Sequence, residues 1–278
     1  MISPDQRRCA VVGTPIAHSL SPVLHRAAYA ATGLDWTYDA FDLAERDLPA
    51  FVSGLDASWR GLSLTMPLKR TVLPLLDEVS ERGRQAYAAN TLIIDEGRLV
   101  GHNTDIPGAV TAIGERVNDP LHTAIILGGG ATATSTLLAL ADLGCAEVTL
   151  VVRDPSRAQE ALSAAERHPR RPRVLVRGFG WSAPAVDILV STIPAQAQAE
   201  LALPFADRAP TVFDVLYDPW PTPLATFAAA EGRVLVAGLD LLLHQACAQF
   251  TLMTGIARAP IEAMRTAGEA ALAARMSQ

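Results

Sequence analysis

A short apolar run followed at once by three glycines constrains this chain more than any other stretch of its sequence. Ala124–Leu127 has the length of a buried strand, Gly128–Gly130 follows directly, and a helix-forming run of leucines and alanines comes next. In such a turn the first glycine permits the tight bend, and the third lets backbone N–H groups approach a phosphate. The helix N-terminus adds partial positive charge and free donors. This order predicts the first unit of a dinucleotide-binding fold. A turn that merely requires small residues is the alternative interpretation.

The segment from residue 107 to residue 237 alternates between strand-like and helix-like runs, as a parallel, doubly wound sheet requires. Pro107–Val117 is the expected connecting helix into this segment. The expected strands are Ala124–Leu127, Glu147–Val152, Arg173–Val176, Asp187–Ser191, Thr211–Leu216 and Arg233–Val236. Helices fill most of the gaps between them, which predicts a Rossmann-type domain.

The first hundred residues predict a separate α/β domain. Its expected strands are Cys9–Ile16, Trp36–Leu43 and Arg60–Pro67, with two more, 88–95 and 99–103, flanking the hairpin turn Glu96-Gly97. Its expected helices begin at Ser21, as N-cap before Pro22, and span Leu48–Val52 and Leu68–Leu76. The last stretch is expected to be helical over Leu239–Gly255 and Ile261–Met276. The first of these two helices is expected to pack against the N-terminal domain.

Length and composition narrow the classes of function. A chain of 278 residues allows about two domains, and its net charge of −6 gives no reason to expect a nucleic acid partner. Cys9, Cys145 and Cys247 lie far apart, which predicts neither a disulfide framework nor a metal site. The N-terminus lacks a signal-peptide pattern, and the uncharged run 123–141 contains too many glycines, threonines and serines for a membrane span. A cytoplasmic protein without a membrane partner is expected.

Polar side chains cluster at the expected ends of strands in the N-terminal half. The clusters contain Ser19, Ser21, Ser63, Thr65, Lys69, Asn90, Asn103 and Asp105. Ligands of open α/β sheets bind just beyond the carboxyl ends of strands, and hydroxyls and carboxamides suit a small polyhydroxylated substrate. Taken singly, each residue also has a structural interpretation, such as a helix cap for Ser21 or a surface position for Lys69. The residues alone predict a two-domain, dinucleotide-dependent enzyme of unknown substrate.

Several longer motifs occur in a fixed order along nearly the whole chain. They are Gly13–Pro22 followed by His25, then Gly61–Lys69, Asn90–Leu92, Gly101–Asp105, Phe213–Tyr217, Thr222–Leu224 and Gly238–Ala246. Together these motifs resemble the shikimate dehydrogenase family. The resemblance implies NADPH-dependent, reversible reduction of 3-dehydroshikimate to shikimate, a step of chorismate and aromatic amino acid biosynthesis.

The resemblance also implies roles for the polar residues. Lys69 and Asp105 would be the catalytic pair, which agrees with the chemistry, because hydride delivery to a ketone leaves an alkoxide that needs a proton donor and positive charge. Ser19 and Ser21 would hold the substrate carboxylate. The other substrate contacts would come from Ser63, Thr65, Asn90, Tyr217 and Gln245. The family usually has asparagine at Ser63, so this contact would be shorter or water-mediated. No metal is implied.

Four histidines, His18, His25, His102 and His244, lie close to these motifs. Dehydrogenases often use histidine as the acid, but the resemblance assigns the proton to Lys69, and a structural role is expected for each histidine. The resemblance gives no reason for the acidic side chain of Asp240.

The expected cofactor contacts are Gly128, Gly129, Gly130, Ala131, Thr132, Arg153, Arg157, Thr192 and Gly238. Arg153 stands at the end of an expected strand, and its guanidinium and that of Arg157 can clamp a 2′-phosphate. An acidic residue at this point would instead select NAD. Asp154 is a candidate for that role, but it directly precedes Pro155 and is better placed to cap a helix. NADP (NADPH) is therefore the expected cofactor.

The expected architecture has a substrate domain over residues 1–106, completed by residues 238–278, and an NADP domain over residues 107–237. The active site is expected in the cleft where they meet, in a monomer or homodimer. One alternative is an NAD-dependent quinate or quinate/shikimate dehydrogenase. Another is a non-catalytic dinucleotide sensor, against which the intact Lys69 and Asp105 argue.

Overall fold

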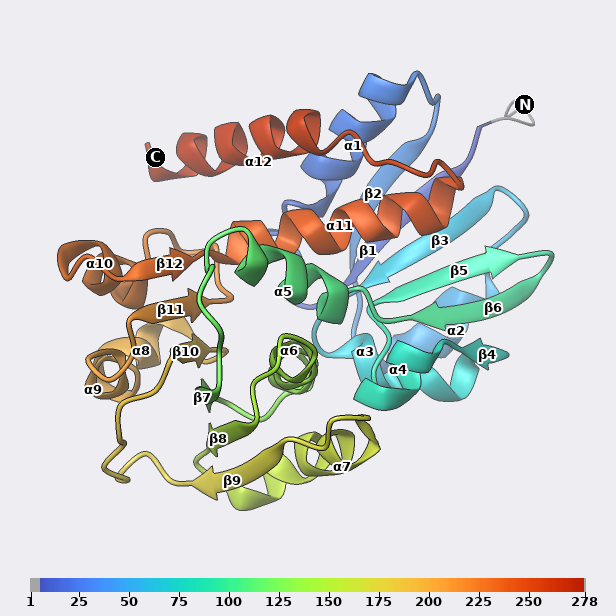
Figure 1. Ribbon diagram of the computed structural model, residues 1–278. Coiled ribbons are helices and arrows are strands. Elements are labelled where there is room, and N and C mark those ends of the chain that lie inside the picture. Colours follow the sequence, from blue (N-terminus) through green and yellow to red (C-terminus); the bar gives the residue numbers. More distant parts are fainter. Residues whose placement is uncertain (1–5, 278) are drawn as a thin grey trace. The chain divides into compact units, whose positions relative to one another are not determined.

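The computed structural model describes residues 6–277, which form two compact units (Figure 1). The first unit takes the described residues up to Thr104 together with those from Leu242 onward, and the second unit is Asp105–Leu241. The boundary after Leu241 falls inside one helix, α11 (Gly238–Thr254). Each unit contains a six-stranded sheet in its described residues.

The sheet of the first unit is mixed and has the strand order β2-β1-β3-β5-β6-β4. Its strands are β1 (Arg8–Gly13), β2 (Thr37–Asp42), β3 (Trp59–Leu64), β4 (Glu78–Val79), β5 (Thr91–Asp95) and β6 (Arg98–His102). β1 pairs in parallel with β2 and β3, whereas β5 is antiparallel to both β3 and β6. The predicted hairpin turn is confirmed, since Glu96 and Gly97 have φ angles of 50° and 80°.

Helices cover both faces of this sheet, because alternate residues of a strand point to opposite sides. The helices are α1 (Ser21–Thr32), α2 (Leu48–Ser53), α3 (Leu68–Thr71), α4 (Glu81–Ala86), most of α11, and α12 (Ile261–Met276). From β1, Cys9 and Val11 enter a core shared with α1, α11 and α12. Ala10 and Val12 enter the opposite core, shared with α2 and α3.

The sheet of the second unit has the strand order β12-β11-β10-β7-β8-β9, and its neighbouring strands are all parallel. Its strands are β7 (Thr123–Leu127), β8 (Glu147–Val151), β9 (Arg173–Arg177), β10 (Ile188–Ser191), β11 (Thr211–Asp214) and β12 (Val234–Val236). The order reverses between β7 and β10, the kind of point at which dinucleotides bind in doubly wound folds. The predicted α/β fold with a Rossmann-type sheet is confirmed.

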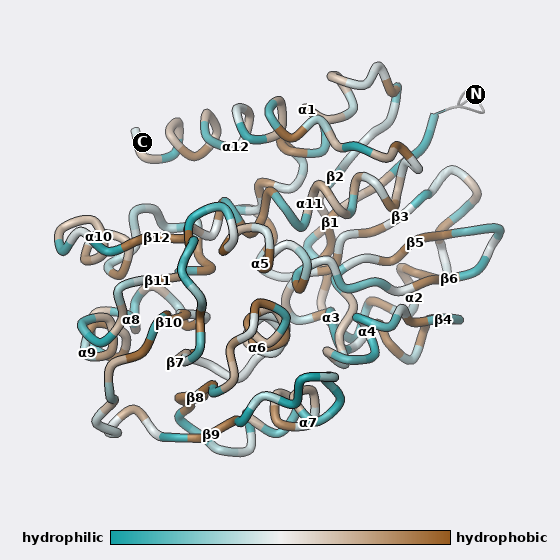
Figure 2. Tube along the Cα trace, viewed as in Figure 1, coloured by the Kyte–Doolittle hydropathy of each residue, from teal (hydrophilic) through white to brown (hydrophobic). Residues whose placement is uncertain are grey.

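The helices of the second unit cover both faces of its sheet. They are α5 (Asp105–Gly114), α6 (Ala131–Asp142), α7 (Gln159–Arg167), α8 (Ala195–Leu201), α9 (Leu203–Ala206) and α10 (Pro223–Ala230). Right-handed crossovers place α6 and α7 on one face and α8 to α10 on the other. The hydrophobic colour that runs along β10 in Figure 2 fits a strand that is buried on both faces.

Three details of the first unit differ from the sequence-based expectation. Ser21 was expected to cap α1, but Leu20 already has helical angles (φ −90°, ψ −3°), and Ser19 Oγ accepts the Ser21 N–H at 3.3 Å instead. The helix expected over 68–76 stops at Thr71 and continues as the 3-10 turn η2 (Leu73–Leu75), because Pro74 has no N–H to donate. The short elements β4 and α4 were not predicted.

Among the helices that the structure describes, none has both the length and the hydropathy needed to cross a lipid bilayer. Within residues 6–277, no three His, Cys, Asp or Glu side chains are grouped so that they could hold a metal ion.

Candidate active site and cofactor site

Predicted site residues of the first unit meet at one edge of its sheet. The parallel strands β1 and β3 both end at this edge, so the segments that follow them bring Ser19, Thr65 and Lys69 to it. β5 is antiparallel to β3 and begins at the same edge, directly after Asn90. The Lys69 carbonyl accepts the Ala89 N–H at 2.8 Å, which ties the lysine backbone to the segment of Asn90.

Asn90 is the centre of a buried hydrogen-bond network at this edge. Its side chain is 1% exposed, and its Oδ1 accepts the Thr104 N–H at 2.8 Å and the Thr91 hydroxyl at 2.9 Å. Its Nδ2 donates to Thr104 Oγ1 at 2.8 Å and to Gln245 Oε1 at 3.3 Å. Because Gln245 lies on α11, the network joins this helix to the sheet edge and holds two predicted site carboxamides together.

Ser19 and Ser21 lie at the N-terminal end of α1. Ser21 is the first residue of the helix and is buried, whereas Ser19 lies in the preceding segment and is half-buried. α1 has no side-chain cap and no acidic residue in its first turn. The end of the helix therefore combines hydroxyl donors with the positive end of the helix dipole, which suits a carboxylate.

Lys69 is the only lysine in the sequence. It lies in α3, shortly after β3, and is half-buried. Asp105 is 6% exposed, begins α5 and directly follows Thr104, which is bonded to Asn90. Partial exclusion of water strengthens the electrostatic effect of both charges on a ligand.

Protein groups also engage the hydroxyl of Ser63, another predicted substrate residue. Ser63 is 4% exposed, lies 2.5 Å from the Tyr38 hydroxyl, and donates to Gln249 Oε1 at 2.8 Å. Gln249 Nε2 in turn donates to the Asn90 carbonyl at 3.1 Å and to Thr91 Oγ1 at 3.0 Å. Gln249 thus links the Ser63 hydroxyl to the Asn90 carbonyl by hydrogen bonds.

Burial favours the neutral form of two of the four histidines near the motifs. His25 is fully buried and stacks on Tyr38 with ring centroids 4.1 Å apart. Burial lowers the pKa of His25 to about 3, against a smaller opposing effect of Gln249. Burial also lowers the pKa of His102, and Glu78 opposes this shift. A neutral imidazole brings no positive charge to a developing alkoxide, which makes these two histidines weaker candidates than Lys69.

In the second unit, the turn after β7 is shaped for the close approach of a ligand. Gly128 has φ of 108°, and a Cβ there would lie 2.2 Å from Thr192 Oγ1. A Cβ on Gly129 would lie 2.4 Å from the Arg157 carbonyl oxygen, whereas one on Gly130 would meet nothing within 4 Å. The first two glycines are required by packing, and the third borders open space.

The N-terminus of α6 faces the same open space. Gly130 is its N-cap, and the first turn, which includes Ala131 and Thr132, has neither a side-chain cap nor an acidic residue. The first N–H groups of a helix have no partner within the helix and carry partial positive charge. These residues therefore fit a pyrophosphate group.

The two arginines predicted to select NADP lie just beyond β8. Arg153 and Arg157 are both exposed, the latter within the 3-10 turn η3 (Pro155–Ala158). Asp154 Oδ1 accepts the Ser156 N–H at 2.9 Å, and hydrogen bonds from Ser156 lower the pKa of this carboxyl. The predicted capping role of Asp154 is confirmed, and the two exposed guanidiniums suit a 2′-phosphate.

A buried carboxylate anchors the loop that leads to Tyr217. Asp214 ends β11 and accepts hydrogen bonds from Thr222 Oγ1 at 2.5 Å, Gln198 Nε2 at 3.0 Å and the Leu216 N–H at 3.2 Å. Burial raises the pKa of Asp214, and these hydrogen bonds oppose the shift. A Cβ on Gly238 would lie 2.4 Å from the Leu216 carbonyl oxygen, so the same loop also requires this glycine.

The structure accounts for Asp240. Its side chain accepts the Ala237 N–H at 3.1 Å and pairs with Arg116 at 3.2 Å. The carboxylate thus stabilises the first turn of α11, and a nearby cation balances its buried charge.

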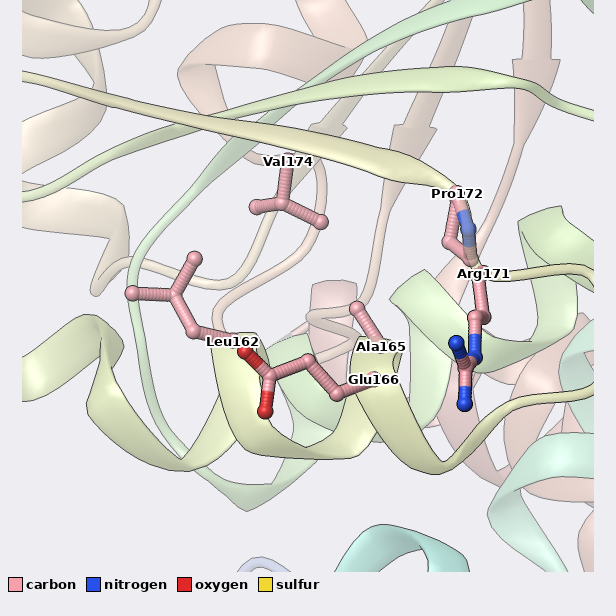
Figure 3. Close-up of a pocket in the computed structure, with 6 residues that line it drawn as sticks. All are labelled: Leu162, Ala165, Glu166, Arg171, Pro172 and Val174. Atoms are coloured by element: carbon pink, nitrogen blue, oxygen red, sulfur yellow. The ribbon is translucent and has the colours of Figure 1, made fainter.

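A hollow of about 530 Å³ lies elsewhere in the second unit, at α7 and β9 (Figure 3). It is lined by Leu162, Ala165, Glu166, Arg171, Pro172 and Val174. None of these six residues belongs to the predicted site.

Family comparisons agree with these features. The family model described as Shikimate dehydrogenase substrate binding domain matches residues 11–92, and that described as Shikimate 5'-dehydrogenase C-terminal domain matches residues 238–267. The shikimate dehydrogenase (NADP(+)) of Desulfitobacterium hafniense (strain Y51) is 38% identical over 269 residues, covering 95% of this chain and 98% of that protein. The chain belongs to the shikimate dehydrogenase family.

Solved structures of shikimate dehydrogenases share the fold. The crystal structure of Mycobacterium tuberculosis shikimate dehydrogenase has a TM-score of 0.87 and 39% identity, covering 95% of this chain and 99% of that chain. The Thermus thermophilus enzyme in complex with NADP(H) and shikimate has a TM-score of 0.82 and 32% identity, with 95% and 99% covered. The resemblance predicted from the motifs is confirmed.

Sequence reasoning missed three residues that hold the predicted site residues in place. Tyr38 and Gln249 hold Ser63 and Asn90, and Asp214 holds the loop before Tyr217. Tyr38 lies in β2, whose sequence is that of an ordinary core strand and gives no sign of a role at the site. Gln249 follows Gln245 by four residues, which places both on one face of a helix and is the signal that could have found it.

Proposed function

We propose that this chain catalyses the NADPH-dependent, reversible reduction of 3-dehydroshikimate to shikimate, a step toward chorismate and the aromatic amino acids. The observation that carries the proposal is the likeness to a shikimate dehydrogenase (NADP(+)) over 95% of the chain. The polar sheet edge of the first unit and the glycine turn of the second unit support it. Initial rates of NADPH oxidation with 3-dehydroshikimate test it.

Residues of the protein supply the proton of this reaction. NADPH, when bound, supplies the hydride that reduces the substrate ketone. Lys69 Nζ stabilises the negative charge that develops on the ketone oxygen and donates the proton that completes the hydroxyl. Asp105 orients the ammonium group and accepts a hydrogen bond from the reacting hydroxyl. In the oxidative direction both residues act in reverse.

The substrate contacts in this proposal follow the polar residues of the motifs. Ser19 and Ser21 bind the carboxylate at the start of α1, where the helix dipole adds to their hydroxyl donors. Hydrogen bonds to the ring hydroxyls come from Thr65, Asn90, Tyr217 and Gln245. Ser63 offers a hydroxyl oxygen as acceptor only, because its hydrogen is donated to Gln249.

Replacing Ser21 with alanine is expected to raise the KM for shikimate about tenfold, since one hydrogen bond to a charged group is lost. The KM for NADP should stay unchanged, because Ser21 lies in the first unit. Steady-state kinetics with each substrate varied in turn measures both values. Ser53→Ala, at an exposed serine of α2, is the matched control. An unchanged KM for shikimate in Ser21→Ala would remove this residue from the substrate site.

The cofactor contacts in this proposal lie in the second unit. Gly128–Gly130, Ala131 and Thr132 bind the pyrophosphate at the start of α6, and Thr192 and Gly238 border the same ligand. Arg153 and Arg157 bind the 2′-phosphate that distinguishes NADP from NAD.

The variant Arg153→Ala is expected to raise the KM for NADP about tenfold or more and to leave the KM for NAD unchanged, since only NADP carries the 2′-phosphate. Steady-state rates measured with NADP and with NAD give the two KM values. Arg177→Ala, which removes an exposed arginine at the end of β9, is the control and should change neither value. If the unmodified protein used NAD as efficiently as NADP, Asp154 would be the selecting residue and this assignment would be wrong.

The domain roles belong to the same proposal. Residues 1–106 with 238–278 form the substrate domain, and residues 107–237 form the NADP domain. The monomeric or homodimeric state and the cytoplasmic location stay predictions from the sequence.

A further inference from the structure

A series of buried hydrogen bonds connects Tyr38 to Gln245 in the first unit, by way of Ser63, Gln249 and Asn90. It passes from the Tyr38 hydroxyl to Ser63 at 2.5 Å, on to Gln249 at 2.8 Å, and then to the Asn90 carbonyl at 3.1 Å. From the Asn90 side chain it reaches Gln245 at 3.3 Å. All five side chains are less than 9% exposed, so water does not compete freely for these bonds.

Two backbone groups fix the orientation of the side-chain amides of Gln249 and Asn90. The Asn90 carbonyl can only accept, so the Gln249 group that faces it is Nε2, and Gln249 Oε1 must face Ser63. The Thr104 N–H can only donate, so it faces Asn90 Oδ1, and Asn90 Nδ2 points to Gln245. Neither amide can flip without breaking a bond to the backbone.

These orientations decide which group donates in the hydrogen bonds from Tyr38 to Ser63 and from Ser63 to Gln249. Because Gln249 Oε1 is an acceptor, Ser63 must donate its only hydrogen to it. The Tyr38 hydroxyl must then donate to Ser63. Tyr38 itself is held by the stacked ring of His25, which is fully buried and neutral. The first donor of the series is therefore rigidly placed.

We infer that Tyr38 and Gln249 are positioning residues for substrate binding, acting through Ser63 and Asn90 to fix the donors and acceptors offered to the substrate hydroxyls. This inference rests on the proposed function and deepens it. Neither residue needs to touch the substrate. Gln249 fixes the Asn90 segment and accepts the Ser63 hydrogen, and Tyr38 holds the Ser63 oxygen by donating to it.

The test uses variants that remove hydrogen bonds of this series and keep the side chain close to its original size. Gln249→Met is expected to raise the KM for shikimate about tenfold, and Tyr38→Phe, which keeps the stacked ring, about threefold. The KM for NADP should stay within about twofold in both, because the bonds lost lie in the first unit. The matched control is Thr254→Val, which removes a hydrogen bond to Phe250 from the same helix. It should leave both constants unchanged.

A double-mutant cycle separates positioning from general destabilisation. In an Asn90→Ala background, Gln249→Met is expected to have little further effect on the KM for shikimate, because the Asn90 side chain that Gln249 positions is gone, although the backbone carbonyl that Gln249 contacts remains. The inference would be overturned if Gln249→Met raised the KM for shikimate by the same factor in the Asn90→Ala background as in the unmodified protein. It would also be overturned if Thr254→Val raised this KM as much as Gln249→Met does.

A readout that does not depend on turnover keeps the inference separate from the proposed function. In the 15N-labelled full-length chain, hydrogen exchange of the Asn90 side-chain amide should be slow and should accelerate at least about tenfold in Gln249→Met. Unchanged exchange would overturn the inference even if the enzyme is active. Absence of shikimate turnover in the unmodified chain would overturn the proposed function alone, and the exchange measurement would still decide the role of Gln249.

Discussion

Lys69→Ala should turn over shikimate about a hundredfold or more slowly than the unmodified chain, with a much smaller change in the KM for shikimate. The physical reason is that the variant has neither the proton donor nor the positive charge that the developing alkoxide needs. Single-turnover and steady-state rates of NADPH oxidation measure the effect. Asp105→Asn should also be severely impaired, because the amide no longer carries the charge that orients the ammonium group.

Lys69→Arg is the control that separates charge from proton transfer. Arginine keeps the positive charge, but its pKa above 12 prevents it from exchanging a proton at working pH. Substrate binding should therefore survive in Lys69→Arg while turnover stays low. A near-normal rate in Lys69→Ala would show that another group supplies the proton. It could not be a second lysine, because the sequence contains no other.

Asp214→Ala should lower the free energy of unfolding of the second unit by about 3 kcal/mol, because buried donors lose their acceptor. The stranded donors are the Gln198 amide and the Thr222 hydroxyl, both fully buried. The loop before Tyr217 also loses its anchor at Leu216, so the KM for shikimate should rise as well. Denaturant unfolding and steady-state kinetics measure the two effects.

Asp214→Asn is the matched variant for this prediction. The carboxamide oxygen can still accept from Gln198 and Leu216, and its Nδ2 can donate to Thr222 Oγ1. Its destabilisation should be less than half that of Asp214→Ala. An Asp214→Ala chain as stable as the unmodified one would contradict the anchoring role.

Local patterns in the sequence predicted most of the elements that carry the site. The apolar runs that became β7 and β8, the hairpin at Glu96 and Gly97, and the helix Ile261–Met276 have bounds close to those observed. These signals are local, since they depend on turn residues and on periodicity within a few residues. The same is true of the capping role of Asp154, which its neighbour Pro155 indicates.

The contacts that hold the site together are not local, and the sequence did not reveal them. Ser63 and Gln249 are 186 residues apart in the chain, and Asn90 and Gln245 are 155 apart. No local period links such pairs, because only the folded sheet and α11 bring them together. The motifs placed Asn90 and Gln245 at the same predicted site, but they did not reveal the hydrogen bond between them. The misplaced cap of α1 has a related cause, since the backbone angles of Leu20 decide where the helix begins.

The most direct test of the account is a set of initial rates for shikimate and quinate, each with NADP and with NAD. Quinate carries an extra hydroxyl on the carbon that bears the carboxylate, next to the groups assigned to Ser19 and Ser21. We expect kcat/KM for shikimate with NADP to exceed that of every other pair of substrate and cofactor at least about tenfold. Equal efficiency with quinate, or with NAD, would contradict it.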